Sequence, residues 1–223
     1  MNKDLKGIFA VWKPKGPSSY DIIRELKHRV TEKKIGHAGT LDPKASGILV
    51  IAVGRDATKR IAEEVSKEKE YAASIRLGAE SSTDDAEGIK RVTHGAKHPK
   101  MEAVRSILTK FEGNIMQVPP VYSALKVQGK TAYARTRAGE QVKLEPRAVI
   151  VKRIELVSYR WPYLKLKVVT GPGVYIRSLA RDIGKELGVG GYLAGLERTR
   201  VGAFTKKNAV RLTVRYKTPK RRQ

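Results

Sequence analysis

Hydrophobic and polar positions recur along the chain with two different periods, which separate predicted strands from predicted helices. A short apolar run at residues 7–12 is followed by a Pro/Gly turn and then by a helical pattern. Ser18 or Ser19 can cap this helix, with Asp21 in its first turn. Its apolar face consists of Ile22, Ile23, Leu26 and Val30.

Further along the chain, the same reading predicts both kinds of element in an irregular order. Residues 48–53 form an unbroken apolar run, typical of a strand covered on both faces. We also expect strands at 71–77, 148–158 and 163–170 and within 191–204, and helices at 56–65 (capped by Asp56), 99–111 and 176–183. Because these elements do not alternate as βαβ units, we expect an α+β fold with a mixed, mostly antiparallel central sheet flanked by helices and loops.

The chain of 223 residues is long enough for one main domain, which we place at residues 1–212. Within it, residues 116–145 are rich in Tyr, Lys and Arg and are interrupted by Pro and Gly. Aromatic rings interleaved with cations suit RNA, but the same composition suits a solvated arm, and it does not decide between them. Residues 213–223 form a basic C-terminal tail.

The charge balance indicates a polyanionic partner. Lys and Arg number 46 against 22 Asp and Glu, which gives a formal net charge of +24. No apolar run reaches the roughly 18 residues that a membrane helix needs, so nucleic acid fits better than a membrane. A strongly solvated surface, as in ribosome-associated or thermophilic proteins, is the alternative.

The composition also limits the chemistry. The chain has no cysteine, which excludes disulfides and thiolate zinc sites. Its four histidines do not include a pair at zincin spacing, so we predict no metal.

One aspartate stands alone in a cationic, glycine-rich stretch, Asp42 in GHAGTLDPKASG. Pro43 disfavours helical geometry at Asp42 and holds it in an extended or turn conformation. The stretch lacks the ending of a phosphate-binding loop, and GPGVYI further on lacks the third glycine of a dinucleotide fingerprint. Two roles for Asp42 remain open, a structural turn and a catalytic carboxylate kept ionised by a neighbouring arginine.

The most acidic segment is AESSTDDAEG, at residues 79–88. It lacks the ligand spacing of an EF-hand. We therefore expect a loop that is solvated or paired with arginine.

Several motifs in order resemble the TruB family of tRNA pseudouridine synthases. The stretch around Asp42 is similar to the family's Gly-His-x-Gly-x-Leu-Asp-Pro signature. Further similarities are carried by VWKPKGPSS, KEYAASIRLG, VPPVYSALKVQGKTAYARTRAGE, GVYIRSLARDIGKELG and YLAGLERTRVGAF, which together span roughly residues 7 to 212. The resemblance implies the pseudouridine synthase fold.

The resemblance also implies roles for individual residues. Asp42 would be the essential catalytic aspartate, Tyr71 would contact the flipped uracil and is the candidate for removing its C5 proton, and Arg177 would pair with Asp42. His37 would insert beside the T-loop to hold the base outside the stack. Further positions that would shape the pocket are Lys13, Pro14, Lys59, Tyr175 and Leu196.

An enzyme of this family needs no cofactor, because the reaction is an isomerisation without redox change. The implied partner is the T-arm of tRNA, and residues 116–145 would be a thumb-like RNA-binding segment. We expect a cytoplasmic protein without a membrane or metal partner, and a monomer because no coiled coil or apolar association face is apparent.

Three features depart from the family pattern. Lys44 stands where a leucine is usual, and Ser82 replaces an aspartate of the acidic loop. After about residue 212 we expect only the tail, where many relatives carry a PUA or similar RNA-binding domain. Two other functions stay open: an idle tRNA-binding or folding chaperone, and the catalytic subunit of a guide-RNA particle that modifies rRNA.

Overall fold

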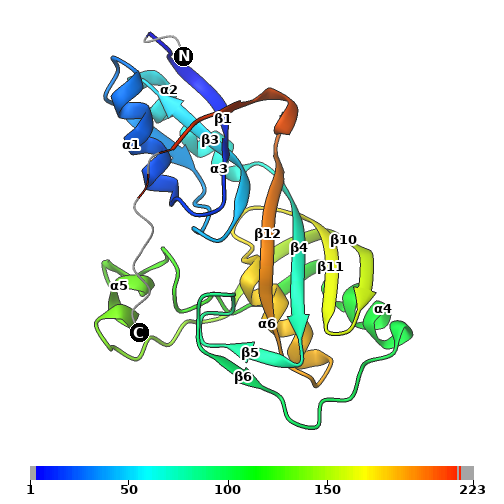
Figure 1. Cartoon of the computed structure of the whole chain (residues 1–223). Coiled ribbons are helices and arrows are strands. Elements are labelled where there is room, and N and C mark those ends of the chain that lie inside the picture. Colours follow the sequence, from blue (N-terminus) through cyan, green and yellow to red (C-terminus); the bar gives the residue numbers. More distant parts are fainter. Residues whose placement is uncertain (1–3, 215, 217–223) are drawn as a thin grey trace. The chain divides into compact units, whose positions relative to one another are not determined.

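The structure, a computed structural model, describes residues 4–214 and 216 (Figure 1). The chain forms two compact units, one of residues up to Ala72 together with those from Leu196 onward, the other of Ala73–Gly195. Strands β4 (Lys69–Leu77) and β12 (Gly191–Val201) contribute residues to both. The predicted domain boundaries at 1–212 stay a prediction, and residues 215 and 217–223 of the predicted tail lie outside the described residues.

The first unit is built on a mixed set of strands. Their order is β14 (Ala209–Arg211), β1 (Gly7–Lys13), β3 (Ser46–Val53) and β12, with β2 (Ile35–Ala38) also paired to β3 and β13 (Phe204–Thr205) to β12. β1 and β2 run antiparallel to β3, whereas β12 runs parallel to it. A short 3₁₀ turn, η1 (Lys206–Asn208), precedes β14.

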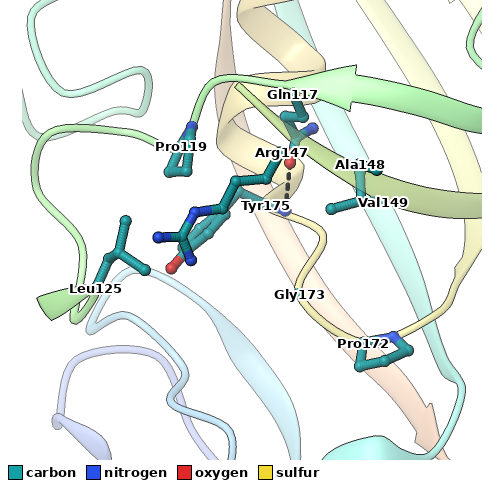
Figure 2. A pocket seen from close by; sticks show the side chains of 9 residues that line it. All are labelled: Gln117, Pro119, Leu125, Arg147, Ala148, Val149, Pro172, Gly173 and Tyr175. Atoms are coloured by element: carbon teal, nitrogen blue, oxygen red, sulfur yellow. Dashed lines mark hydrogen bonds between the residues drawn. The ribbon is translucent and has the colours of Figure 1, made fainter. Parts of the chain in front are cut away.

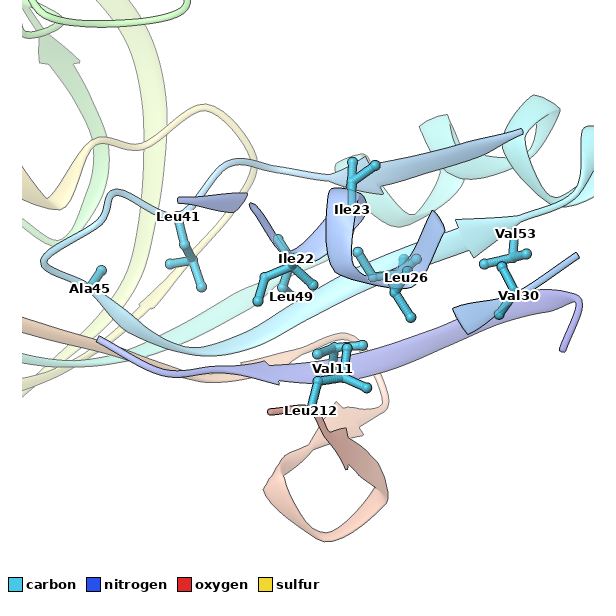
Figure 3. Close-up of a cluster of buried hydrophobic side chains, with 11 residues drawn as sticks. Val11, Ile22, Ile23, Leu26, Val30, Leu41, Ala45, Leu49, Val53 and Leu212 are labelled. Carbon is cyan, nitrogen blue, oxygen red and sulfur yellow. The ribbon is translucent and has the colours of Figure 1, made fainter. Parts of the chain in front are cut away.

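Side chains of β3 pack on both of its faces, as the unbroken apolar run predicts. On one face, helix α1 (Ser19–Arg29) lays Ile22 and Leu26 against Leu49 of β3 and Val11 of β1 (Figure 3). On the other face, Ile48 and Val50 pack with residues from β13 and β14. Burial on both faces makes β3 the rigid strand on which the loop before it depends.

The start of α1 is fixed by a capping box. The Ser18 side chain accepts a hydrogen bond from the amide of Asp21 at 3.1 Å, and the Asp21 carboxylate accepts one from the amide of Ser18 at 2.8 Å. Two of the amides that would otherwise lack a partner at this helix end are therefore satisfied. Ser18, one of the two predicted caps, is confirmed.

The predicted single helix at 56–65 is wrong. The structure has two short helices, α2 (Arg55–Lys59) and α3 (Ile61–Ser66), separated at Arg60. The residue before α2 is Gly54, with φ +99°, and its carbonyl accepts from Thr58 at 2.9 Å. The helix therefore begins before Asp56 can act as its cap.

The second unit contains a row of antiparallel strands. The order is the end of β4, then β11 (Tyr163–Thr170), β10 (Arg147–Arg160) and β7 (Gly113–Gln117). Its helices are α4 (Met101–Lys110), α5 (Ala132–Arg137) and α6 (Ile176–Glu186). Two small hairpins, β5 (Ala79–Ser81) with β6 (Lys90–Val92) and β8 (Lys126–Val127) with β9 (Lys130–Thr131), complete it.

Mixed strands and interspersed helices confirm the predicted α+β class. The predicted inward face of α6 is also confirmed, since Ile176, Leu179, Ala180 and Ile183 are buried. Among the described residues, no helix is both long enough and apolar enough to span a membrane.

We predict that Ser18→Ala lowers the free energy of unfolding by about 1 kcal/mol, because the amide of Asp21 loses its acceptor. Chemical denaturation measures this change. The control is Ser106→Ala on the exposed surface of α4, which should change stability by less than about 0.5 kcal/mol. Equal effects of the two substitutions would show that the capping box does not stabilise α1.

Candidate active site

The loop that carries Asp42 joins β2 to β3 and is anchored on both sides of the aspartate. Leu41 and Ala45 are buried in the cluster beneath α1. The amide of Ala45 donates to the carbonyl of Asp42 at 3.0 Å, which closes a turn. Asp42 itself is partly buried. The carboxylate therefore extends from a rigid frame, as the proline that follows it suggests.

Two hydrogen-bonded tethers connect this loop to the segment that begins α1. The hydroxyl of Ser19 donates to the carbonyl of Leu41 and accepts from its amide, both at 2.9 Å. The amide of Gly16 donates to the carbonyl of Pro43 at 2.8 Å. The residues directly before and after Asp42 are thus both held by the same short segment.

Lys13, at the end of β1, is completely buried. Its ammonium donates to the carbonyl of Pro17 at 2.7 Å and to that of Pro14 at 3.1 Å. Burial lowers the pKa of Lys13 to about 8, and the attraction of Asp42 opposes this shift. A buried ammonium therefore lies within electrostatic range of the Asp42 carboxylate.

Tyr71 on β4 is brought to the same place and is only 6% exposed. Its phenol has Arg198 as a cationic neighbour. Burial raises the pKa of Tyr71 and the charge of Asp42 raises it further, whereas Arg198 acts in the opposite direction. At neutral pH, Tyr71 is accordingly a neutral phenol that shares an electrostatic environment with Asp42.

Arg198 was not among the residues predicted from the sequence. It lies on β12 and is 2% exposed. Its Nε donates to the carbonyl of Ile48 at 2.7 Å and its Nη2 to that of Gly39 at 3.0 Å. A signal was present in the sequence, because period-two alternation places this arginine on the same strand face as Leu196, which packs into the core.

His37 lies on β2 and is partly buried. Its Nδ1 is enclosed without a hydrogen-bond partner among the described residues. Burial lowers the pKa of His37, and the repulsion of Arg198 adds to this effect. The imidazole is therefore neutral at neutral pH and presents a ring rather than a charge.

The other predicted residues of the first unit have varied surroundings. Pro14 is part of the turn that binds the Lys13 ammonium. Leu196 is partly buried against the cluster beneath α1. Lys59 is exposed at the end of α2, where its cation is free to reach an external phosphate. Lys44, the departure from the family pattern, is exposed as well.

Arg177 lies in the second unit, near the start of α6, and is buried. Its Nη2 donates to the carbonyl of Tyr122 at 2.9 Å, and its Nη1 lies 3.9 Å from an oxygen of Asp85. The predicted pairing of Arg177 with Asp42 joins residues of two units and stays a prediction.

Arginines of α6 also account for the acidic segment. Arg181 forms an ion pair of 2.8 Å with Asp84, in addition to the Arg177 contact with Asp85. Ser82 keeps a local role, since its hydroxyl accepts from the amide of Ile89 at 3.0 Å. The prediction of an arginine-paired loop is confirmed.

Tyr175 precedes α6 and borders a cavity of about 300 Å³. Its amide donates to the side chain of Gln117 at 2.8 Å. Figure 2 shows the side chains of Arg147 and Tyr175 extending in the same direction, beside Pro119 and Leu125. A cation beside an aromatic ring offers both charge and stacking to a ligand.

The segment at 116–145 forms a small folded arm around α5. Arg135 holds it together through the carbonyl of Val127 at 3.1 Å and the carboxylate of Glu140 at 2.7 Å. Tyr133 is 46% exposed, and the guanidinium of Arg137 lies 6.0 Å from its ring centre. The arm therefore presents an aromatic ring and a cation together on its surface.

Residues 4–214 and 216 contain no candidate metal site. Within that part of the chain, no group of three or more His, Asp or Glu side chains could hold a metal ion.

Comparison with known proteins places these motifs in a family. Residues 27–176 match the profile described as TruB family pseudouridylate synthase (N terminal domain), and residues 177–214 match that of the tRNA pseudouridylate synthase B C-terminal domain. The chain is 43% identical to tRNA pseudouridine synthase B of Parabacteroides distasonis over 199 residues, which cover 86% of this chain and 84% of the relative. It is also 43% identical to the protein of the same name from Cutibacterium acnes over 208 residues, 92% of this chain and 70% of the relative.

Solved structures agree with the fold. A chain of the Cbf5-Nop10-Gar1 complex superposes with a TM-score of 0.70 at 29% identity, over 92% of this chain and 52% of that chain. A chain of an H/ACA RNP bound to a substrate RNA containing 2'-deoxyuridine gives a TM-score of 0.67 at 27% identity, over 92% of this chain and 50% of that chain. The present chain thus spans about half the length of these two.

The lowered lysine pKa values predict an unusual pH dependence of stability. Lys69 donates to the carbonyls of Val65 and Lys67, and burial lowers its pKa to about 8. Between about pH 8 and 10.5, the unfolded chain keeps the proton that the folded chain has lost. The free energy of unfolding should therefore rise with pH in this window, by up to about 1.4 kcal/mol per pH unit.

Lys69→Met tests this expectation by denaturation between pH 7 and 10.5. The stability difference between wild type and variant should be constant below pH 8 and should move in favour of the wild type above it. Lys126→Met, at an exposed lysine of β8, is the matched control. A difference that is independent of pH would contradict the assignment.

Proposed function

Because the chain belongs to the TruB family of pseudouridylate synthases, we propose that it isomerises uridine-55 in the T-loop of tRNA to pseudouridine. The observation that carries this proposal is that Asp42, on a loop tethered on both sides, lies within electrostatic range of the buried Lys13 and Tyr71. A carboxylate fixed in this way is better suited to a covalent or basic role in catalysis than to a structural role in a surface turn. The relatives at 41–44% identity carry the name tRNA pseudouridine synthase B.

The reaction is balanced without any added group. The bond between N1 of uracil and C1′ of the ribose breaks, the base turns, and C5 forms a bond to C1′. The proton of C5 leaves, and N1 gains a proton. Asp42 acts by adding to the ring, by attacking C1′, or by removing the C2′ proton, and each of these routes needs the carboxylate in its ionised form.

The other groups of the site have complementary roles. Tyr71 contacts the flipped uracil and is the candidate for removing the C5 proton, and as a phenol it has to ionise before it can do so. Arg198 is the neighbour that favours this ionised form. Arg177 pairs with Asp42, and His37 inserts its neutral ring beside the T-loop. Lys13, Pro14 and Leu196 shape the pocket around the base.

Flipping a stacked base costs a few kcal/mol, which contacts to the RNA must offset. The lysine and arginine side chains that give the chain its formal net charge of +24 provide contacts to the RNA phosphates. Lys59 and Arg147 are exposed cations on separate units. The arm at 116–145 offers Tyr133 for stacking and Arg137 for a phosphate.

The direct test uses a tRNA transcript that carries tritium at uridine C5. The protein alone should release the label, and the position of the product should map to uridine-55. Release that requires a guide RNA would favour the guide-RNA particle instead. RNA binding without release would favour the chaperone.

Asp42→Asn should abolish release, because the amide carries no negative charge, while most of the tRNA affinity remains. Single-turnover release and filter binding measure the two properties separately. The control is Asp56→Asn, at an exposed aspartate of α2. An Asp42→Asn variant that stays active would show that Asp42 is only a turn residue.

Tyr133→Leu should weaken tRNA binding by about tenfold, because a base stacked on an aromatic ring contributes about 1–3 kcal/mol. Binding is compared at one fixed salt concentration, since phosphate contacts depend on salt. The matched control is Tyr163→Leu, at a tyrosine of β11 with a similar exposure, 48% against 46%. Equal affinities of the two variants would show that the arm does not stack on RNA.

A further inference from the structure

Arg198 differs from the buried Arg177 and from the partly buried Arg181 and Arg200 in the contacts that it makes. Arg177 and Arg181 each approach a carboxylate, and so does Arg200, two residues further along β12. In the part of the chain that the structure describes, the guanidinium of Arg198 donates to two backbone carbonyls and has the Tyr71 phenol as an electrostatic neighbour, with no carboxylate among its partners. Burying a cation without a counter-ion lowers the stability of the folded protein. The buried position of Arg198 therefore needs an explanation.

The two carbonyls lie on opposite sides of Asp42 in the sequence. Gly39 comes three residues before the aspartate and Ile48 six residues after it, and one guanidinium binds both, at 3.0 and 2.7 Å. The rigid planar fork of arginine suits this task, since it holds several acceptors in a fixed relation. Arg198 therefore closes the whole Asp42 loop across its base.

Two glycines of the Asp42 motif border this arginine, and Gly47 makes room for its backbone. A Cβ on Gly47 would lie 2.2 Å from the carbonyl oxygen and 2.6 Å from the amide nitrogen of Arg198, and Gly47 has φ +117°. Gly39 has φ +81°, and a Cβ there would lie 3.4 Å from the guanidinium. Gly47 thus allows β3 to approach the backbone of Arg198, whereas Gly39 supplies a positive φ in the loop beside the guanidinium.

Arg198 also lies within electrostatic range of the phenol of Tyr71, on β4. We propose that Arg198 is a positioning residue, which holds the Asp42 loop and the Tyr71 phenol in the fixed relation that the isomerisation requires. This inference rests on the proposed function and adds to it a residue from a different strand. Arg198 acts through Asp42 and Tyr71 and does not itself need to touch the uridine.

The ionisable groups around Tyr71 come from several elements. Asp42 faces it from the loop and Arg198 from β12. Lys69 of β4, Lys13 of β1 and His37 of β2 each interact with Arg198. Arg198 opposes the effect of burial on the pKa of Tyr71, so its loss should be visible in the titration of that phenol.

The first test compares Arg198→Lys with Arg200→Lys in single-turnover release of tritium from the tRNA transcript. Lysine keeps the charge but not the fork, so Arg198→Lys should lose about 100-fold in rate, the typical consequence of a misplacement of about 1 Å. Its tRNA affinity should equal that of the wild type. Arg200→Lys should retain the wild-type rate, because Arg200 bonds Glu68 and the carbonyl of Gly202 rather than the Asp42 loop.

The second test is a readout that does not depend on activity. Tyrosine labelled with ¹³C at Cζ reports the titration of Tyr71, assigned with Tyr71→Phe. In Arg198→Met the titration of Tyr71 should move to higher pH than in the wild type, and in Arg200→Met it should not. Because the titration does not depend on activity, it tests the inference even if the Arg198→Met variant is folded but inactive.

Wild-type rates in Arg198→Lys would overturn the inference, and so would a loss of rate that matches a loss of tRNA affinity. An unchanged Tyr71 titration in Arg198→Met would overturn it as well. Failure of the wild-type protein to release tritium would instead overturn the proposed function. The two failures are therefore distinguishable.

Discussion

The structure of the candidate site depends on one buried guanidinium. Arg198 of β12 binds the carbonyls of Gly39 and Ile48 and neighbours the phenol of Tyr71, so one side chain links the Asp42 loop with β4. Because this cation has no carboxylate partner among the described residues, its burial makes the free energy of folding less favourable. The cost is offset by the core around it, in which both faces of β3 are covered. A rigid sheet thus supports a site that is electrostatically unfavourable.

The same arrangement explains the other unusual groups. Lys13 and Lys69 are buried close enough to Arg198 to feel its repulsion, and burial is the main reason that the pKa of each falls to about 8. Both ammonium groups bind backbone carbonyls, so they stabilise the frame rather than compete for substrate. Asp42 is the carboxylate within electrostatic range of Lys13 in this frame. Held on each side through Ser19 and Gly16, it can be stiff without being part of a helix or strand.

Much of the fold could be predicted from local patterns. The helix capped at Ser18, the doubly covered strand β3 and the inward face of α6 follow from periodicity and capping alone. The start of α2 did not, because a backbone with positive φ at Gly54 is not visible in an apolar pattern. Arg198 was missed because a charged residue in a strand is usually expected to be exposed, and only the fold shows that Gly47 leaves room for its backbone and that its guanidinium binds the Asp42 loop.

The central claim is that Arg198 rigidifies the Asp42 loop. Native-state hydrogen exchange at the amides of Leu41 and Ala45, in wild type and in Arg198→Lys, tests it most directly. The amide of Val30, which caps α1 through the carbonyl of Leu26 at 3.0 Å, serves as the internal reference. The account predicts that protection at Leu41 and Ala45 falls in the variant while protection at Val30 is retained. Equal protection of the loop amides in both proteins would contradict it.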